Sequence, residues 1–445
     1  MNIYLLTLYG FTIYSVFKLI VNKNSLNDSL KYIIVTFVFG YRTVELFKGF
    51  KIHPIEVIIF FSIFNILIYN HRQVTKYPRF LKVLLPFCIF SFVFELLFGP
   101  GNYVYSTIYG SLESFKHFSN LFLVFFVLSY IKIDFEYLRS LFIVLMAALS
   151  FICIGGYIEW FNTSLAVAIF GYSFDIETRN NLDAMFKVFQ EDSFNRLNFS
   201  WWGSHTAANV ALPVLPVGIY LIKYFKKWKI KLLLIFIILF DLYIVYLSGN
   251  RFAWLFIVIF LIFYYFFYFR SFSIFIKILP LVVITIFVMN YDIASSATFK
   301  RFFSIFQIIT GNIDIGFDSS GGSRLKRLSD ALNFIPSNPL GMGWGKSGWV
   351  HSDFIQFTAD LGWVPGMIFM IAPFILTNKL RILLKNEPAN LFDLHFTMFI
   401  LMIYVILTLA VNQTYALAQT GVPTFLCWGL VYAYLNFKSK SQHIH

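Results

Sequence analysis

The sequence predicts an all-α polytopic membrane protein, a single domain (1–445) with about 13 transmembrane helices (12–14) and two long extracytoplasmic loops containing short amphipathic helices. Two observations predict this class. Hydrophobic residues make up 59% of the chain and charged residues 13%, whereas soluble domains are about half apolar and a quarter charged. Apolar runs of roughly 18 or more residues, each long enough to cross a bilayer as a helix, recur along the chain.

The apolar runs define the candidate spans. They lie at residues 3–20, 32–48, 54–70, 83–99, 118–131, 140–160, 206–222, 232–249, 252–269, 276–291, 358–378, 395–411 and 420–436. The first run lacks the charged head and the cleavage site of a removable signal peptide. Cys88, Cys153 and Cys427 all fall inside such runs, so we interpret them as small buried hydrophobic residues.

The distribution of charge predicts the orientation of the spans. Four short segments are dense in Lys and Arg: 71–82, 223–231, 378–385 and 438–442. Lys and Arg collect in cytoplasmic loops, so the net charge of +13 indicates membrane orientation rather than a nucleic-acid partner. Alternation then places the loops at 161–205 and 292–357, and the joins near Arg251 and Asn412, on the outer side. The C-terminus is expected inside and the N-terminus outside.

Arginines mark the first outer loop and the next outer join. Arg196 lies just before a span, where it fits either an interfacial anchor or an anion ligand. Trp201, close by, is either a headgroup-level aromatic residue or a platform for a sugar ring. Arg251, in "SGNRFAWL", stands between two spans, where a charge costs free energy unless it meets an anion, a carbonyl group or water. The alternative is that its side chain extends to the interface.

The second outer loop contains an amphipathic segment. Apolar residues recur every three or four positions over 324–335, which predicts a short helix with Ser323 as its N-cap and Pro336 after its end. Arg324 and Arg327 fall on or near its polar side. A helix start with arginines suits a phosphate group, and a solvated basic face is the alternative.

A glycine-rich stretch follows, "NPLGMGWGKSGWVHSDFIQF" (338–357). Glycines 341, 343, 345 and 348 allow a tight path close to another group. Trp344 and Trp349 are candidate sugar contacts within it.

The stretch ends at a predicted helix start. Asp353 is expected to cap the helix, with Gln356 completing a capping box. His351 then lies just before the helix, where it is either a structural side chain or a proton acceptor, since an imidazole can take up a proton near neutral pH. Neither a metal-ligand spacing of His and Cys nor a convincing acidic pair is present in the sequence, so we expect no metal and no cofactor.

These segments together resemble the O-antigen ligase and polymerase superfamily, bacterial membrane enzymes that join lipid-linked glycans outside the cytoplasmic membrane. The likeness rests on "SGNRFAWL", "GSRLKRLSDALNFIPSNPLGMGWG" and "HSDFIQFTADLGWVPG", and it covers about half the chain, from Arg196 onward. It implies that Arg196, Arg251 and Arg324 bind the pyrophosphate of a polyprenyl-diphosphate donor, with Arg327 competing for the role of Arg324.

The same resemblance implies roles for two further residues. His351 would activate or orient the acceptor hydroxyl group without a metal. Asp360 stands where the family often has a glutamate. The usual glycine pair after the histidine reads "GWVPG" here, and Pro365 changes its spacing.

Within this superfamily we favour an O-antigen or surface-polysaccharide polymerase, because polymerases are the more numerous and divergent group and the chain departs from the glycine pattern of ligases. Such a glycosyltransferase moves a glycan chain from undecaprenyl diphosphate to a lipid-linked repeat unit, with inversion, on the outer side of the bacterial inner membrane. One alternative is a ligase that transfers the glycan to lipid A–core or to protein. A second is a flippase or other transporter of lipid-linked oligosaccharides. The expected partners are the lipid-linked oligosaccharide and the bilayer, with a chain-length regulator as a further candidate and no nucleic acid.

Overall fold

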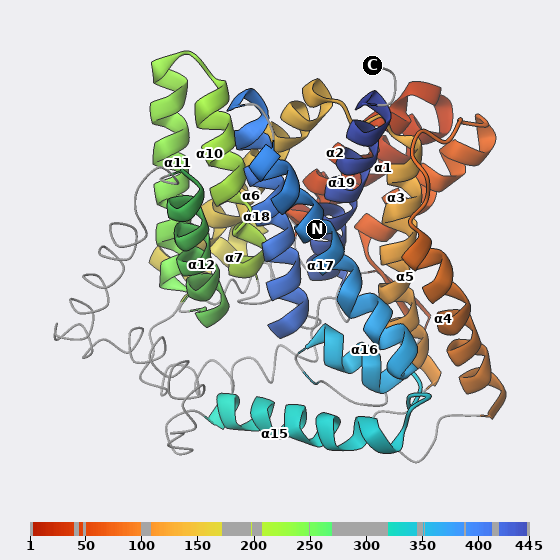
Figure 1. Cartoon of the computed structure of the whole chain (residues 1–445). Coiled ribbons are helices and arrows are strands. Elements are labelled where there is room, and N and C mark those ends of the chain that lie inside the picture. The colour runs from red at the N-terminus through yellow and green to blue at the C-terminus, as the bar shows by residue number, and fades with distance from the viewer. Residues whose placement is uncertain are drawn as a thin grey trace.

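The computed structural model describes residues 3–39, 44–47, 50–98, 108–170, 197, 207–248, 250–268, 319–344, 350, 352–386, 389–411 and 418–442. These residues are helical apart from one short hairpin, the joins and the glycine-rich loop (Figure 1). Up to Phe170 the elements are α1 (Ile3–Val21), the 3₁₀ helix η1 (Lys23–Asp28), α2 (Ser29–Phe37), β1 (Val44–Phe47), β2 (Phe50–Ile52), α3 (Pro54–Ile68), α4 (Arg79–Phe98), α5 (Ile108–Tyr130), α6 (Phe135–Phe161) and α7 (Thr163–Phe170).

The remaining elements include the longest helices of the C-terminal part. They are α9 (Ala207–Ala211), α10 (Val214–Tyr224), α11 (Trp228–Leu247), α12 (Arg251–Tyr268), α15 (Ser319–Phe334), the 3₁₀ helix η3 (Ile335–Ser337), α16 (Asp353–Leu361), α17 (Trp363–Asn386), α18 (Ala389–Val411) and α19 (Ala418–Gln442).

The prediction of a helical membrane protein is confirmed in its coarse form. Within the described residues, six helices are long and apolar enough to cross a membrane. Their spans are Tyr4–Val21, Phe135–Phe161, Ala207–Tyr224, Trp228–Leu247, Trp363–Lys385 and Leu391–Val411. Shorter apolar helices lie at Pro54–Ile68, Phe115–Tyr130 and Phe252–Tyr268. The predicted span at 276–291 lies outside the described residues.

The predicted span at 32–48 is wrong. Helix α2 ends at Phe37, and β1 then pairs with β2 as an antiparallel hairpin, with Val44 opposite Ile52. The sequence explains the change, because polar Glu45 alternates with apolar neighbours in "VELF" and Lys48–Gly49 separates two short apolar runs. That pattern is typical of a hairpin rather than of a continuous helix.

The predicted span at 358–378 is also displaced. Gly362 has a φ of +95° and separates the short helix α16 from α17, which begins at Trp363. A positive φ is readily adopted by glycine and interrupts the right-handed helix. The crossing helix therefore starts after Gly362, and α16 stands apart from it.

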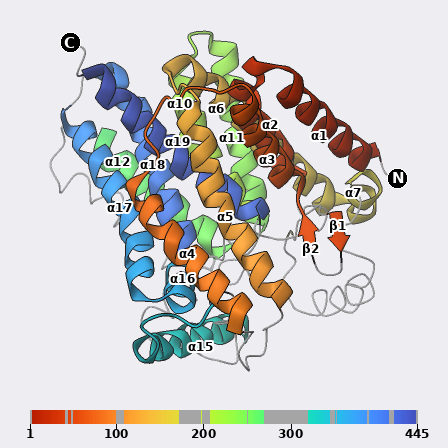
Figure 2. The same ribbon diagram turned by 90° about the vertical axis from the view of Figure 1, so that its right-hand side faces the viewer.

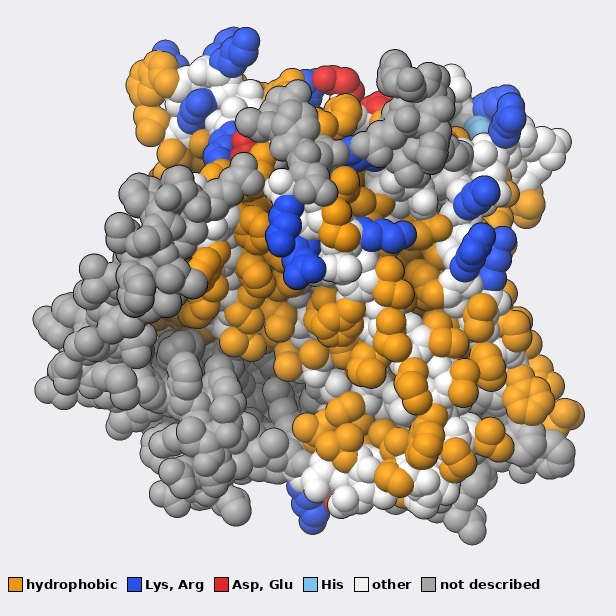
Figure 3. All heavy atoms as spheres, viewed as in Figure 1, with side chains coloured by type: hydrophobic (Ala, Val, Ile, Leu, Met, Phe, Trp, Pro, Cys, Tyr) orange, Lys and Arg blue, Asp and Glu red, His pale blue; other side chains and the backbone are white. Residues whose placement is uncertain are grey.

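The bundle has two chemically different ends (Figures 1 and 2). The joins between α3 and α4, α10 and α11, and α17 and α18, together with the end of α19, lie at one end, which we call the basic end. Helices α15 and α16 lie at the opposite end, which we call the loop end. Lys and Arg side chains gather over the upper part of the face in Figure 3, above a broad apolar band. All four Lys- and Arg-rich segments of the sequence belong to the basic end or border it.

The core lies around α5, α18 and α19. Large side chains such as Phe118, Tyr404 and Trp428 are fully buried there. By contrast, α4, α11 and α17 expose large apolar residues along their outer faces, among them Phe90 and Phe236. Such an apolar outer surface suits a lipid environment, where helices pack closely against one another and present apolar side chains to the acyl chains.

Candidate functional site

Backbone hydrogen bonds tie the glycine-rich loop to α16. The Met342 N–H donates to the Ala359 carbonyl oxygen at 2.9 Å, and the Gly343 N–H donates to the Asp360 carbonyl oxygen at 2.9 Å. The loop therefore runs alongside the last turn of α16, and its position does not depend on the identity of these side chains.

Two glycines make this close approach possible. Gly341 has a φ of +81°, and a Cβ atom there would collide with the Asp360 carbonyl oxygen. A Cβ at Gly362 would collide with the carbonyl oxygen of Pro339, which also accepts a hydrogen bond from the Trp363 N–H at 3.0 Å. The expected tight path is thus confirmed at Gly341, while positions 345 and 348 lie outside the described residues.

Trp344 is a core residue, which corrects its assignment as a sugar contact. Its side chain is 1% exposed, and its Nε1–H donates to the Cys88 carbonyl oxygen at 3.3 Å. Its ring packs against Phe115 and Phe118 of α5 and Phe357 of α16. The apolar slot between α4, α5 and α16 covers the indole, so neither face is open to a sugar ring.

The start of α16 differs from the expected cap by one residue. Ser352 is the N-cap and Asp353 the first helical residue, so the predicted capping box of Asp353 and Gln356 is wrong. The Gln356 side chain instead turns back, and its Oε1 accepts from the Val350 N–H at 3.4 Å. Both Val350 and Ser352 are buried. His351 itself lies outside the described residues, but its two neighbours place the backbone on either side of it against α16.

Helix α15 exists as predicted but starts earlier. It begins at Ser319, so Ser323 lies inside the helix and is not its N-cap. Glycine in a helix costs about 1 kcal/mol relative to alanine, and the helix continues through Gly321 and Gly322 nonetheless. The helix ends at Phe334, before Pro336, as expected.

Among the candidate arginines, only Arg327 has a side chain that the structure describes. The Arg327 side chain is exposed on α15, while that of Arg324 lies outside the described residues. Arg251 is the first residue of α12, and its side chain is likewise outside them. The other end of α12 lies at the basic end, because the Tyr268 hydroxyl donates to Asp393 at the start of α18. Arg251 therefore begins α12 at the loop end.

The first outer loop is also tied to this region. Leu197 is buried, and its N–H donates to the Leu247 carbonyl oxygen at 2.9 Å. Leu247 is the last residue of α11, just before the join that carries Arg251. The chain beside position 196 is thus bonded to this join. Arg196, Trp201 and Trp349 lie outside the described residues.

A buried polar cluster between α3 and α5 was missed by the sequence analysis. Glu56 accepts from the His53 N–H at 2.9 Å and from the Asn120 side chain at 3.1 Å. The Lys116 Nζ and the His117 Nδ1 each lie 3.4 Å from its carboxylate oxygens. The signal was present in "HPIE", because a proline at a helix start and a glutamate at the third helical position are typical of a capped N-terminus.

The cluster and the Trp344 slot use neighbouring residues of α5. Lys116 and His117 belong to the cluster, while Phe115 and Phe118 contact Trp344. The two lie at the same height along α5, so this helix links the N-terminal third of the chain to the glycine-rich loop.

No group of three or more His, Cys, Asp or Glu side chains that could hold a metal ion occurs among the described residues. No protein-family model matches the sequence, and no curated protein matches it. The interpretation of the site therefore depends on the chemistry of its own residues.

Proposed function

We propose that this chain is a glycosyltransferase of the polymerase type, which transfers a glycan from undecaprenyl diphosphate to a lipid-linked repeat unit. The basic end would face the cytoplasm, following the preference of Lys and Arg for that side. The loop end would then face the periplasm or exterior of a bacterial inner membrane.

One observation carries the proposal more than any other. The start of α12, helix α15, and the residues flanking position 351 share the loop end. They are far apart in the sequence and carry Arg251, Arg324 and His351. A reaction at a diphosphate lipid needs several cations and one proton acceptor on the same side of the membrane, and this arrangement supplies the segments that bear them.

The chemistry follows from the absence of nucleotide donors outside the cytoplasm. A donor there must carry its own leaving group, and a diphosphate lipid does so. The acceptor hydroxyl oxygen forms a bond to the anomeric carbon from the opposite side, while the bond from that carbon to the diphosphate breaks. His351 takes the hydroxyl proton, which contributes about 10²–10⁴-fold. Arg251 and Arg324, with Arg196, stabilise the negative charge that develops on the departing diphosphate.

A ligase would use the same site with a different acceptor, lipid A–core or protein. A transporter is the other candidate, and one observation favours it. Asp241 is fully buried in the second half of α11, where its carboxylate accepts from the Ser150 hydroxyl at 2.8 Å. An ionisable residue within a span is often part of a transport path. Conversely, the start of α12, helix α15 and the residues flanking position 351 share one end of the bundle, which supports an interfacial enzyme.

The test is elongation by purified protein in lipid nanodiscs supplied with a synthetic undecaprenyl-diphosphate repeat unit. We expect a ladder of products that EDTA does not abolish, and a loss of about 10²-fold or more in His351→Ala. Arg324→Ala should lose more activity than Arg327→Ala. Lys326→Ala is the matched control, because Lys326 is an exposed cation on the same helix.

Three outcomes would contradict the proposal. Full activity of His351→Ala would show that His351 is not the proton acceptor. Transfer to lipid A–core without a ladder would show a ligase. Translocation of the lipid-linked oligosaccharide without a new glycosidic bond, and its loss in Asp241→Asn, would show a transporter.

A further inference from the structure

Four large apolar side chains are exposed close together at the loop end. Leu340 is 90% exposed, Val364 56%, Met367 50% and Trp363 40%. We call them the rim patch. Leu340 belongs to the glycine-rich loop, and the other three belong to the first turn and a half of α17.

The patch is held in place by the backbone. The Trp363 N–H donates to the Pro339 carbonyl oxygen at 3.0 Å, and the Trp363 Nε1–H donates to the Ile335 carbonyl oxygen at 3.0 Å. The backbone of Leu340 lies directly against Gly362. Leu340 is therefore presented at a fixed position beside Trp363 and is not the free tip of a loose loop.

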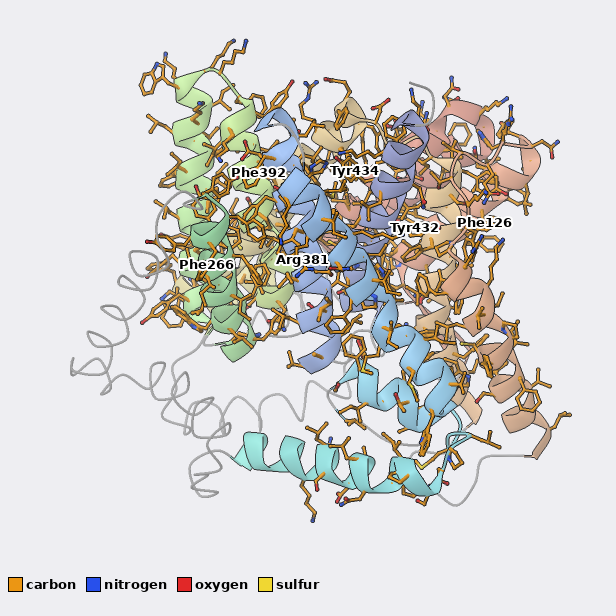
Figure 4. All side chains as sticks on the ribbon, in the orientation of Figure 1. Phe126, Phe266, Arg381, Phe392, Tyr432 and Tyr434 are labelled. Carbon is orange, nitrogen blue, oxygen red and sulfur yellow. The ribbon has the colours of Figure 1, made fainter. Side chains whose placement is uncertain are left out.

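The rim patch continues the membrane-facing surface of α17. Farther along this candidate span, Met370, Ile371, Phe374 and Ile375 are all exposed. They form one apolar stripe that runs from the patch along the helix, and Arg381 follows farther along α17 in the direction of the basic end (Figure 4). Because the stripe belongs to a helix suited to lipid, the patch at its end is continuous with the lipid-facing surface.

Helix α15 has a matching division of polar and apolar faces. It lies across the loop end, roughly perpendicular to the bundle helices (Figure 1). Lys326, Ser329, Asp330 and Asn333 share one exposed face, while Ala331 on the other side is buried toward the bundle. A helix in this orientation with a charged outer face is typical of one lying along a membrane surface.

We propose that the rim patch inserts into the lipid leaflet at the loop end, at the boundary between headgroups and acyl chains. Trp363 lies there as an interfacial aromatic residue, with its N–H group bonded to the protein and its ring in the lipid. Leu340 anchors the glycine-rich loop to the leaflet, and Lys326 and Arg327 of α15 lie near the height of the lipid phosphates.

The anchor fixes the depth of the candidate site. Leu340 precedes Gly341 and Met342, which are bonded to α16, and His351 follows in the same stretch. The loop is thereby set against the leaflet surface itself. This docking does not require that the chain transfer glycans, and its test does not use activity.

The test is depth-dependent fluorescence quenching. The three native cysteines are buried, so a single introduced cysteine can be labelled with an environment-sensitive fluorophore. We would label Leu340→Cys, Val364→Cys and Ser329→Cys separately and place each protein in nanodiscs containing lipids with a nitroxide just below the headgroup. Val364 is the reference for lipid contact, and Ser329, on the polar face of α15, is the reference for water.

We expect the label at position 340 to show a blue-shifted emission and quenching close to that at 364, and well above that at 329. Quenching at 340 no greater than at 329 would overturn the proposal, and so would quenching at 364 that is equally weak. Efficient cross-linking between two copies through Leu340→Cys would show that a second copy of the chain covers the patch, and would overturn it as well.

Discussion

The two ends of the bundle are held together by different kinds of contact. At the basic end, side chains link the helices. Asp393 at the start of α18 accepts from the Lys223 Nζ of α10 at 2.7 Å and from the Tyr268 hydroxyl of α12. The Lys438 Nζ of α19 donates to the Nε2 of His395 at 3.2 Å. Figure 4 shows Phe392 and Tyr434, neighbours of these groups, in the same region.

At the loop end, the glycine-rich loop is held by peptide groups and one buried indole, next to the side-chain cluster of Glu56 on α3 and α5. The glycine-rich loop is bonded to α16 through main-chain atoms, and Trp344 fills the slot beside α5. Side-chain ion pairs in contact with water are weak and sensitive to salt and pH. Main-chain bonds are insensitive to both, but they tolerate no added bulk at a glycine. The basic end is therefore sensitive to salt and pH, and the loop end is sensitive to a side chain added at a glycine.

The largest effect is expected from Trp344→Ala. Removing a fully buried indole costs about 3–5 kcal/mol of the free energy of unfolding, because the slot between α4, α5 and α16 is left empty. The thermal unfolding midpoint in detergent would measure it. Trp344→Phe is the control, since it keeps an aromatic ring and loses the hydrogen bond to Cys88, worth about 1 kcal/mol. Equal losses in the two variants would mean that packing at the loop end matters little.

Gly341→Ala should come next. A φ of +81° and a collision with the Asp360 carbonyl oxygen should together cost about 2 kcal/mol or more. The matched control is Gly10→Ala, because a Cβ at Gly10 in α1 meets nothing within 4 Å and alanine favours a helix by about 1 kcal/mol. An unfolding midpoint unchanged in Gly341→Ala would contradict the backbone account of this end.

At the basic end, Asp393→Asn should have a smaller effect. The Lys223 and Asp393 side chains are 34% and 30% exposed, so the coupling between them should be about 1 kcal/mol or less. A double-mutant cycle with Lys223→Gln would measure this coupling, and high salt should reduce it. The exposed pair Glu136 and Arg139 provides a comparison. A coupling that salt leaves unchanged would mean that the basic end is not screened by solvent.

The smallest effect is a pH dependence at the same end. Burial, together with the charge of Lys23, lowers the pKa of His71 below its ordinary value near 6.5. The folded state then binds fewer protons than the unfolded state, so the contribution of His71 to stability is complete above that value and declines as the pH falls below it. Unfolding midpoints between about pH 8 and pH 5 should show a slightly flatter profile for His71→Gln than for the parent. Superimposable profiles would exclude this contribution.

Much of the architecture was accessible from the sequence because length and hydropathy alone specify a membrane helix. The spans at 140–160 and 395–411 are of this kind, and each lies within an apolar helix of the structure. The failures occurred where a local backbone feature overrode hydropathy. The hairpin at residues 44–52 and the helix break at Gly362 both depend on backbone conformation. The hydropathy of a segment contains no information about that conformation.

The candidate site was predicted less completely, and for a different reason. Glycine at position 341 could be interpreted from its freedom to adopt a positive φ. The burial of Trp344 could not be predicted, because an indole in a glycine-rich loop is equally compatible with an exposed sugar contact and with a buried core residue. The choice depends on α4 and α5, which are distant in sequence. The Glu56 cluster likewise needs α5 beside α3 before its residues form a group.

A contact made by main-chain hydrogen bonds does not depend directly on which side chains the joined residues carry. The hydrogen bond between positions 342 and 359 does not involve their side chains, although Ala359 is buried and limits the size of a replacement there. Such a loop tolerates changes at its exposed positions, as long as the glycines that hold its shape are kept. Relatives of this chain are therefore to be sought by their fold and by the spacing of those glycines, rather than by percentage identity.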